Sequence, residues 1–168
     1  ALFVARDTTE RKRTEEEIRM MAIIDSLTGL YNRRGFIHLA EQQMKVTARN
    51  DSRLLLFFID LDGLKSINDN HGHEEGDRAI KKAAYILKKT FRESDIIARL
   101  GGDEFAIMVS DGPELPEKAL KRLKNYTDIE NAASGLPYSI AMSTGVAAYD
   151  PAVPCSIHEL MSRADKMM

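Results

Sequence analysis

Cysteine is nearly absent from this chain of 168 residues, in which Cys155 is the only one. A single cysteine excludes an internal disulfide and a cysteine-based zinc site, and it fits a reducing compartment, so we expect a cytoplasmic location. An excess of charge of one sign is also lacking, because 24 basic and 26 acidic residues leave a formal net charge of -2. A chain so balanced has no general surface for polyanions, and we expect no nucleic-acid partner.

Long hydrophobic runs are lacking as well. The longest strongly apolar run, Leu54 to Ile59, is far shorter than the roughly 20 residues of a membrane-spanning helix. The N-terminus has no basic and then apolar layout of a signal peptide, so we expect no membrane contact by this segment. The chain begins abruptly at Ala1 and stops at Met168 inside a predicted helix, which predicts a piece of a longer protein. Membrane attachment of that parent protein stays open.

The patterns that are present predict one α/β domain behind a short N-terminal appendage. Residues 1–7 resemble the end of a strand, and the charged stretch from Thr9 to Ile24 predicts a connecting helix. The narrow apolar stripe of this predicted helix fits two interpretations equally: the helix pairs with the same helix of a second chain, or it packs on its own domain. Apolar periodicity then predicts helices over 33–48, 74–91 and 115–129, strands over 54–61, 95–100, 104–109 and 138–146, and a last helix opened by a Ser156–Glu159 capping box.

The order of these elements is βαββαβ plus a C-terminal helix. It predicts the split βαβ, ferredoxin-like arrangement of the α/β (α+β) class, with a central mixed or antiparallel sheet flanked by helices.

Carboxylates gather at two predicted strand ends. Asp60 and Asp62 alternate at the end of the most apolar strand, and Asp103 and Glu104 lie at the tip of a predicted hairpin. Four carboxylates beside one sheet edge repel each other, and a divalent cation best explains such a cluster. Oxygen ligands with no nearby cysteine favour Mg2+ or Mn2+ over zinc, and magnesium commonly binds substrate phosphates as well. This cluster therefore predicts phosphate chemistry.

A nucleotide site between the two clusters is the next hypothesis. The strand gives way to a short helix whose first amides, with Lys65 close by, would form a cradle for a triphosphate. Asn68 and Asp77 are candidates for reading a base, because a carboxylate can accept both the ring N–H and the exocyclic amine of guanine. On spacing alone, ordinary turn and capping roles explain these residues about equally well.

Four motifs in order resemble one known family. They are DSLTGLYNRR from Asp25, IDLDGLKSINDNHGHEEGD from Ile59, RLGGDEF from Arg99 and SIAMSTGVA from Ser139. Together they resemble the GGDEF family of diguanylate cyclases over nearly everything from Asp25 onward. The resemblance implies a nucleotide-cyclase palm that condenses two GTP to cyclic di-GMP and two pyrophosphates with Mg2+ (or Mn2+). It also implies a GGDEF domain over 25–168.

The resemblance assigns roles residue by residue. Asp60, the backbone carbonyl of Leu61, Asp103 and Glu104 would hold the metal ions, and Asp103 and Glu104 would be catalytic, with Asp103 the family's acceptor of the 3′-hydroxyl proton. Gly63, Leu64 and Lys65 would bind the phosphates of the substrate. Asn68 and Asp77 would bind its guanine, and Gly101 and Gly102 would leave room for GTP.

Two further features of the family bear on regulation. Arg92 and Asp95 match the RxxD site at which cyclic di-GMP inhibits synthesis, and the planar fork of arginine suits both phosphate and guanine. The alternative is a surface ion pair at a helix end.

The stretch ARDTTERKRTEEE resembles the exit of a PAS sensor domain, so residues 1–24 are expected to be the end of an upstream sensor and a linker helix. Catalysis would need a homodimer, because each GTP attacks the other.

One departure and two alternatives complete the prediction. Family members continue past the last helix with a lysine and an arginine that contact the triphosphate, so we expect the GGDEF domain to be truncated at its C-terminal helix. A degenerate module that binds GTP or cyclic di-GMP without catalysis is the main alternative, and the presence of Asp60, Asp103 and Glu104 argues against it. A cyclase with relaxed base choice is the second, and Asp77 favours guanine.

Overall fold

The structure is a computed structural model that describes residues 22–50, 52–110 and 116–168. The predicted strand end and the linker helix as far as residue 21 lie outside the described residues. The predicted helix was wrong in its last three residues, because 22–24 form a turn and an isolated bridge from Ile24 to Tyr31. The side-chain amide of Asn32 fixes this turn by donating to the carbonyls of Ala22 and Ile24, at 3.2 and 3.3 Å.

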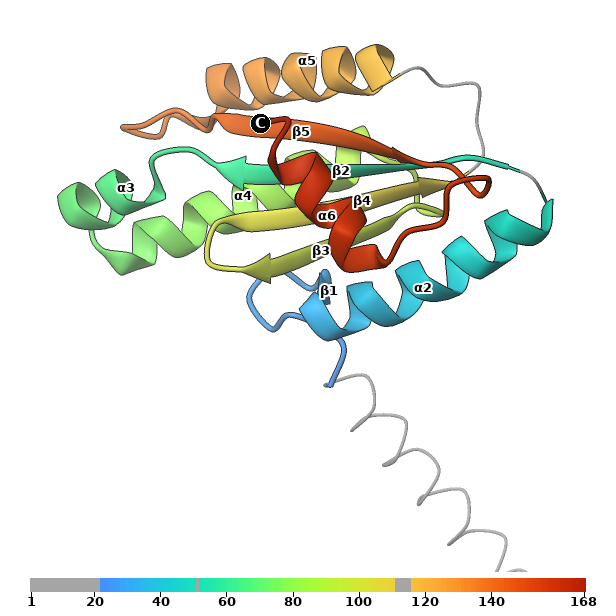
Figure 1. The fold of residues 1–168 in the computed structure, drawn as a ribbon. Coiled ribbons are helices and arrows are strands. Elements are labelled where there is room, and N and C mark those ends of the chain that lie inside the picture. Colours follow the sequence, from blue (N-terminus) through green and yellow to red (C-terminus); the bar gives the residue numbers. More distant parts are fainter. Residues whose placement is uncertain (1–21, 51, 111–115) are drawn as a thin grey trace, which may run out of the picture.

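One five-stranded sheet forms the centre of the molecule, with the strand order β1-β3-β4-β2-β5 (Figure 1). Neighbouring strands are antiparallel except for β1 and β3, which are parallel, and this confirms the predicted ferredoxin-like sheet. The strands are β1 (Tyr31–Asn32), β2 (Leu54–Leu61), β3 (Ile96–Gly101), β4 (Glu104–Ser110) and β5 (Met142–Tyr149).

Two strands differ from the prediction. The two residues of β1 are too few to show a period, so the sequence pattern did not reveal this strand. Strand β5 begins at Met142 instead of Tyr138. The backbone N–H and C=O of Ile140 are both bound by the side-chain amide of Asn131, each at 2.8 Å, which keeps this segment out of the strand ladder.

Five described helices surround the sheet: α2 (Arg33–Asn50), α3 (Leu64–His71), α4 (His73–Thr90), α5 (Pro116–Ser134) and α6 (Ile157–Asp165). The predicted capping box opens α6 and is confirmed, because Ser156 Oγ accepts from Glu159 N at 3.2 Å and the Glu159 carboxylate accepts from Ser156 N at 2.8 Å. In the part of the chain that the structure describes, none of these helices combines the length and the apolar character needed to cross a membrane.

Both faces of the sheet are covered. Helices α3, α4 and α5 pack on one face, and α2 and α6 pack on the other (Figure 1). In β2, residues 57, 59 and 61 belong to the first core, and residues 54, 56 and 58 belong to the second. This explains the continuous apolar run of β2, since a strand buried on both sides shows no alternation. The next even position, Asp60, therefore lies on the α2 and α6 face.

Candidate active site

The registers of three strands bring the predicted carboxylates to one end of the sheet. Asp60 of β2 stands opposite Glu104 of β4 and opposite Ser143 of β5. The backbone N–H of Leu61 donates to the carbonyl of Asp103 at 2.9 Å, which ties the hairpin tip to the end of β2. Side chains directly opposite on antiparallel strands are close neighbours, so Asp60 and Glu104 share one face.

The electrostatics of this end show how strongly the carboxylates interact. Burial raises the pKa of Asp60 above its usual value, and the negative charges of Asp103, Asp62, Glu104 and Asp165 raise it further. Asp165 lies in α6, far from the motifs that predicted the cluster, and no spacing in the sequence pointed to it. The fold thus adds a fifth carboxylate to the four that were expected.

The donors at this end fit a hard divalent cation in their chemistry. They are carboxylates and a backbone carbonyl, and a cation would relieve the repulsion that raises the pKa of Asp60. Among the residues that the structure describes, no three Asp, Glu, His or Cys side chains are arranged to hold a metal as they stand. The Glu104 carboxylate is instead paired with the Arg33 guanidinium at 3.4 Å; the Glu104 side chain is 41% exposed and that of Arg33 is 52% exposed. So exposed a pair contributes little, and Glu104 can exchange it for a metal ion.

A second arginine fastens the hairpin tip. Arg99 donates from Nε and Nη2 to the carbonyl of Gly102, at 3.0 and 2.8 Å, and from Nη1 to both carboxylate oxygens of Asp25, at 3.4 and 3.3 Å. Gly102 has a φ of 52°, in the left-handed region that favours glycine. A Cβ at Gly102 or at Gly101 would meet no atom of the described residues within 4 Å, its chain neighbours apart, so the tip has open space beside both glycines.

Asp25 anchors the loop that leads into the domain. Burial acts to raise the pKa of Asp25, but hydrogen bonds from Thr28 and the charge of Arg99 outweigh it and lower the pKa below its usual value. Thr28 donates to Asp25 Oδ1 from Oγ1 at 2.6 Å and from its backbone N at 3.0 Å. The motif DSLTGLYNRR therefore holds the hairpin tip in place through the contact of its Asp25 with Arg99, a role that its sequence did not indicate.

The predicted phosphate residues lie where β2 passes into α3. Gly63 is the N-cap of α3, has a φ of 72° and offers no side-chain hydrogen bond to the first turn. Leu64 is buried and Lys65 is exposed, so Leu64 could contact a phosphate only through its backbone. The start of α3 follows Asp60 and Asp62 directly along the chain.

The predicted base-reading residues come from two consecutive helices. Asn68 of α3 is half-buried and Asp77 of α4 is exposed. Gly72, with a φ of 88°, separates the two helices, and its backbone N–H donates to the carbonyl of Asn68 at 2.9 Å. The Asn68 side chain then rests against α4 at Gly76, one residue before Asp77.

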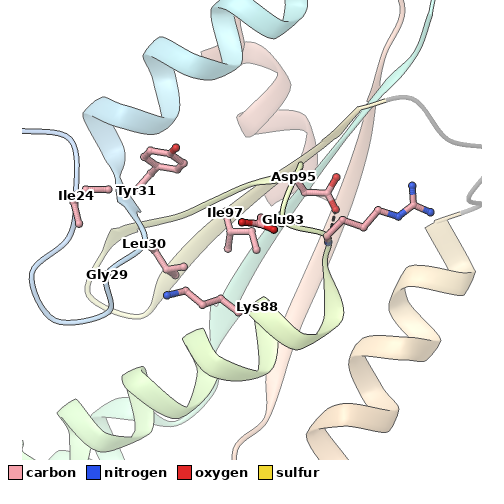
Figure 2. A pocket seen from close by; sticks show the side chains of 9 residues that line it. Ile24, Gly29, Leu30, Tyr31, Lys88, Glu93, Asp95 and Ile97 are labelled. Atoms are coloured by element: carbon pink, nitrogen blue, oxygen red, sulfur yellow. Dashed lines mark hydrogen bonds between the residues drawn. The ribbon is translucent and has the colours of Figure 1, made fainter. Parts of the chain in front are cut away.

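The predicted inhibitory residues form a tight turn between α4 and β3. The buried Asp95 carboxylate accepts from the backbone N–H of Arg92 at 2.8 Å, and the Asp95 N–H donates back to the Arg92 carbonyl at 3.0 Å. A pocket of about 390 Å³ lies beside this turn, and Figure 2 shows Tyr31 and Lys88 among the side chains that line it. Arg122 of α5 donates to the carbonyl of Thr90 in the same region, a neighbour that the RxxD spacing could not reveal.

Comparisons with known proteins agree with the family that the motifs resemble. Residues 22–168 match the family model described as "Diguanylate cyclase, GGDEF domain". The chain is 36% identical over 165 residues to the bifunctional diguanylate cyclase/cyclic di-GMP phosphodiesterase MucR of Pseudomonas aeruginosa, and 36% identical over 166 residues to the diguanylate cyclase DgcM of Escherichia coli. It matches 95% and 98% of its own length in these alignments, but spans only 23% and 39% of those relatives.

A solved structure gives the same picture of the fold. The coiled coil and GGDEF domain of DgcB from Caulobacter crescentus, determined in complex with c-di-GMP, superimposes with a TM-score of 0.81 at 26% identity. The match covers 97% of this chain and 88% of that one. The nucleotide-cyclase palm expected from the motifs is thereby confirmed as the fold.

Proposed function

Because the chain belongs to the GGDEF family of diguanylate cyclase domains, we propose that it is the catalytic part of a cyclase that joins two GTP molecules into cyclic di-GMP and releases two pyrophosphates. The observation that carries this proposal is the cluster of carboxylates at one end of the sheet, where Asp60 stands opposite Glu104 and the backbone N–H of Leu61 binds the carbonyl of Asp103. Such a cluster favours a divalent cation, and this family gives that cation a phosphoryl-transfer role. The single free cysteine and the substrate GTP both suit the cytoplasm.

The carboxylates would divide the work of metal binding and proton transfer. Asp60, the carbonyl of Leu61, Asp103 and Glu104 would hold Mg2+ (or Mn2+), with Glu104 released from Arg33 as it turns to the ion. A bound cation would neutralise charge on the α-phosphoryl group and the departing pyrophosphate and lower the pKa of the attacking hydroxyl. Asp103 would take the 3′-hydroxyl proton, and Arg99 would keep the hairpin tip in register.

The substrate would lie across the start of α3 and the hairpin tip. The backbone of Gly63 and Leu64 and the ammonium group of Lys65 would bind phosphates, and the open side of Gly101 and Gly102 would leave room for the nucleotide.

The base would be read further along the chain, by residues of α3 and α4. Asp77 would accept from the ring N–H and the exocyclic amine of guanine, and the Asn68 amide would bind a second part of the base edge. Adenine presents no such donor pair, so this arrangement favours GTP.

Assembly and regulation follow from the chemistry. Each GTP must attack the α-phosphate of the other, so two domains with one GTP apiece would meet across a two-fold axis, under the control of an upstream sensor. Cyclic di-GMP would inhibit by binding at Arg92 and Asp95, whose turn is already held rigid by its own hydrogen bonds.

A metal-dependent turnover assay tests the proposal. The protein at high concentration is incubated with GTP and MgCl2, and cyclic di-GMP is separated by chromatography. We expect product from the wild type and from Lys124→Ala, an exposed control on α5, and none from Glu104→Ala or with excess chelator. GTP or cyclic di-GMP binding in the absence of any product would instead favour the non-catalytic module.

A further inference from the structure

Gly76 is a buried glycine and the fourth residue of α4, at a place where glycine is a poor choice for the helix itself. Glycine is among the weakest helix formers, and alanine in its place would favour α4. Positive φ does not explain it, because Gly76 is not among the glycines with a left-handed backbone. The reason must therefore lie in the space around it.

The amide head of Asn68 fills that space. A Cβ at position 76 would lie 1.9 Å from Asn68 Oδ1, 2.9 Å from Cγ and 3.3 Å from Nδ2. These three nearest atoms all belong to one side chain, and none belongs to the backbone of α3. The first group that a side chain at position 76 would meet is thus the Asn68 amide, which can rest where it does only because residue 76 is glycine.

The backbone around Gly76 is firmly held. The hydroxyl of Tyr138 donates to the carbonyl of Glu75 at 3.0 Å and to its carboxylate at 2.9 Å. Burial and the hydrogen bond that the hydroxyl donates to the Glu75 carboxylate raise the pKa of Tyr138 to about 12, so the hydroxyl stays a donor. A methyl group at position 76 would therefore displace the Asn68 side chain, which can turn about two bonds, and leave α4 in place.

We propose that Gly76 is a positioning residue for guanine recognition, because its missing side chain holds the Asn68 amide beside Asp77. This inference rests on the proposed function, in which Asn68 and Asp77 read the base. Asp77 is the next residue along α4 and is exposed, so the Asn68 amide, which comes from α3, rests against α4 one residue before the Asp77 carboxylate.

Binding measurements on a double-mutant cycle test the inference. The probe is GTP with a methylene bridge between its α- and β-phosphates, which cannot release pyrophosphate, and its adenine counterpart is the second ligand. Gly76→Ala is expected to weaken binding of the guanine probe about tenfold, the effect of one lost hydrogen bond to the base. Binding of the adenine probe should not change, and the melting temperature should stay equal or rise.

The cycle separates positioning from packing. In the Asn68→Ala background, Gly76→Ala should cause no further loss of affinity, because the group it displaces is already gone. Tyr85→Ala, an exposed neutral change in the same helix, is the control and should leave binding of the guanine probe at the wild-type level.

Three results would contradict the inference, and they differ from failure of the proposed function. Wild-type affinity in Gly76→Ala, fully additive losses in the double variant, or a melting temperature lower by many degrees would each show that Gly76 does not act through Asn68. Wild-type affinity in Asn68→Ala would instead overturn the proposed base site itself, and the inference with it.

Discussion

Replacing Arg99 by alanine should weaken both the fold and the reaction, because one side chain joins the hairpin tip to the entry loop. The Arg99 side chain is only 14% exposed and that of Asp25 only 20%. The Arg99 guanidinium makes two hydrogen bonds to the carbonyl of Gly102 and two longer ones to the carboxylate of Asp25. Truncation leaves the Gly102 carbonyl and the Asp25 carboxylate without this donor.

The expected cost follows from these contacts. Hydrogen bonds from a charged donor contribute about 1.5 to 3 kcal/mol each when their partner is left unsatisfied, but Thr28 still satisfies part of Asp25. We therefore expect a loss of about 2 to 3 kcal/mol in the free energy of unfolding. In a chain of this size, that loss lowers the melting temperature by roughly 4 to 12 °C. The freed tip also moves Asp103 and Glu104, and a displacement near 1 Å lowers kcat by about 100-fold.

Calorimetry and turnover assays on matched variants measure both effects. Arg99→Lys keeps the charge but cannot bind Gly102 and Asp25 together, so it should recover little of either loss. Lys124→Ala breaks a pair that is 77% and 61% exposed, and it should cost less than about 0.5 kcal/mol. If Arg99→Ala melted within 1 °C or so of Lys124→Ala, or kept wild-type kcat, the lock between tip and loop would not exist.

Three further outcomes are expected from other parts of the site. Gly145→Ala would place a Cβ 1.9 Å from the carbonyl oxygen of Ala164, which is backbone and cannot turn aside, so calorimetry should show a loss of about 1 to 3 kcal/mol. Burial and the neighbouring carboxylates make the ionised form of Asp60 unfavourable in the fold, as its raised pKa shows. Asp60→Asn should therefore raise the melting temperature of the metal-free protein at pH values above that pKa, and the gain should vanish at lower pH. The same variant should abolish turnover. The lowered pKa of Asp25 stabilises the fold above about pH 4, and this contribution is lost as the pH falls through the folded-state pKa. Asp25→Asn should therefore flatten the decline of melting temperature below about pH 4, and an unchanged slope would contradict the role given to its hydrogen bonds.

Most of the fold could be predicted from the sequence because its signals are local. The apolar run of β2, the helical spacing of α4 and the capping box of α6 each describe how a segment meets its core, and each appears in the structure. The missed details have two causes: the two residues of β1 are too few to show a period, and other segments are fixed by a side chain from elsewhere in the chain. The segment before β5 stays out of the ladder because Asn131 binds the backbone of Ile140.

The candidate site divides in the same way. The sequence by itself determined which carboxylates, glycines and arginines stand at the strand ends, since motif order and strand period fix their places along the chain. Only the tertiary structure decided that Arg99 reaches Asp25 across 74 residues, that Asp165 adds its charge to Asp60, and that Gly76 makes room for Asn68. Periodicity encodes which face a residue occupies, whereas contacts between distant elements depend on strand register and helix packing, which no single segment contains.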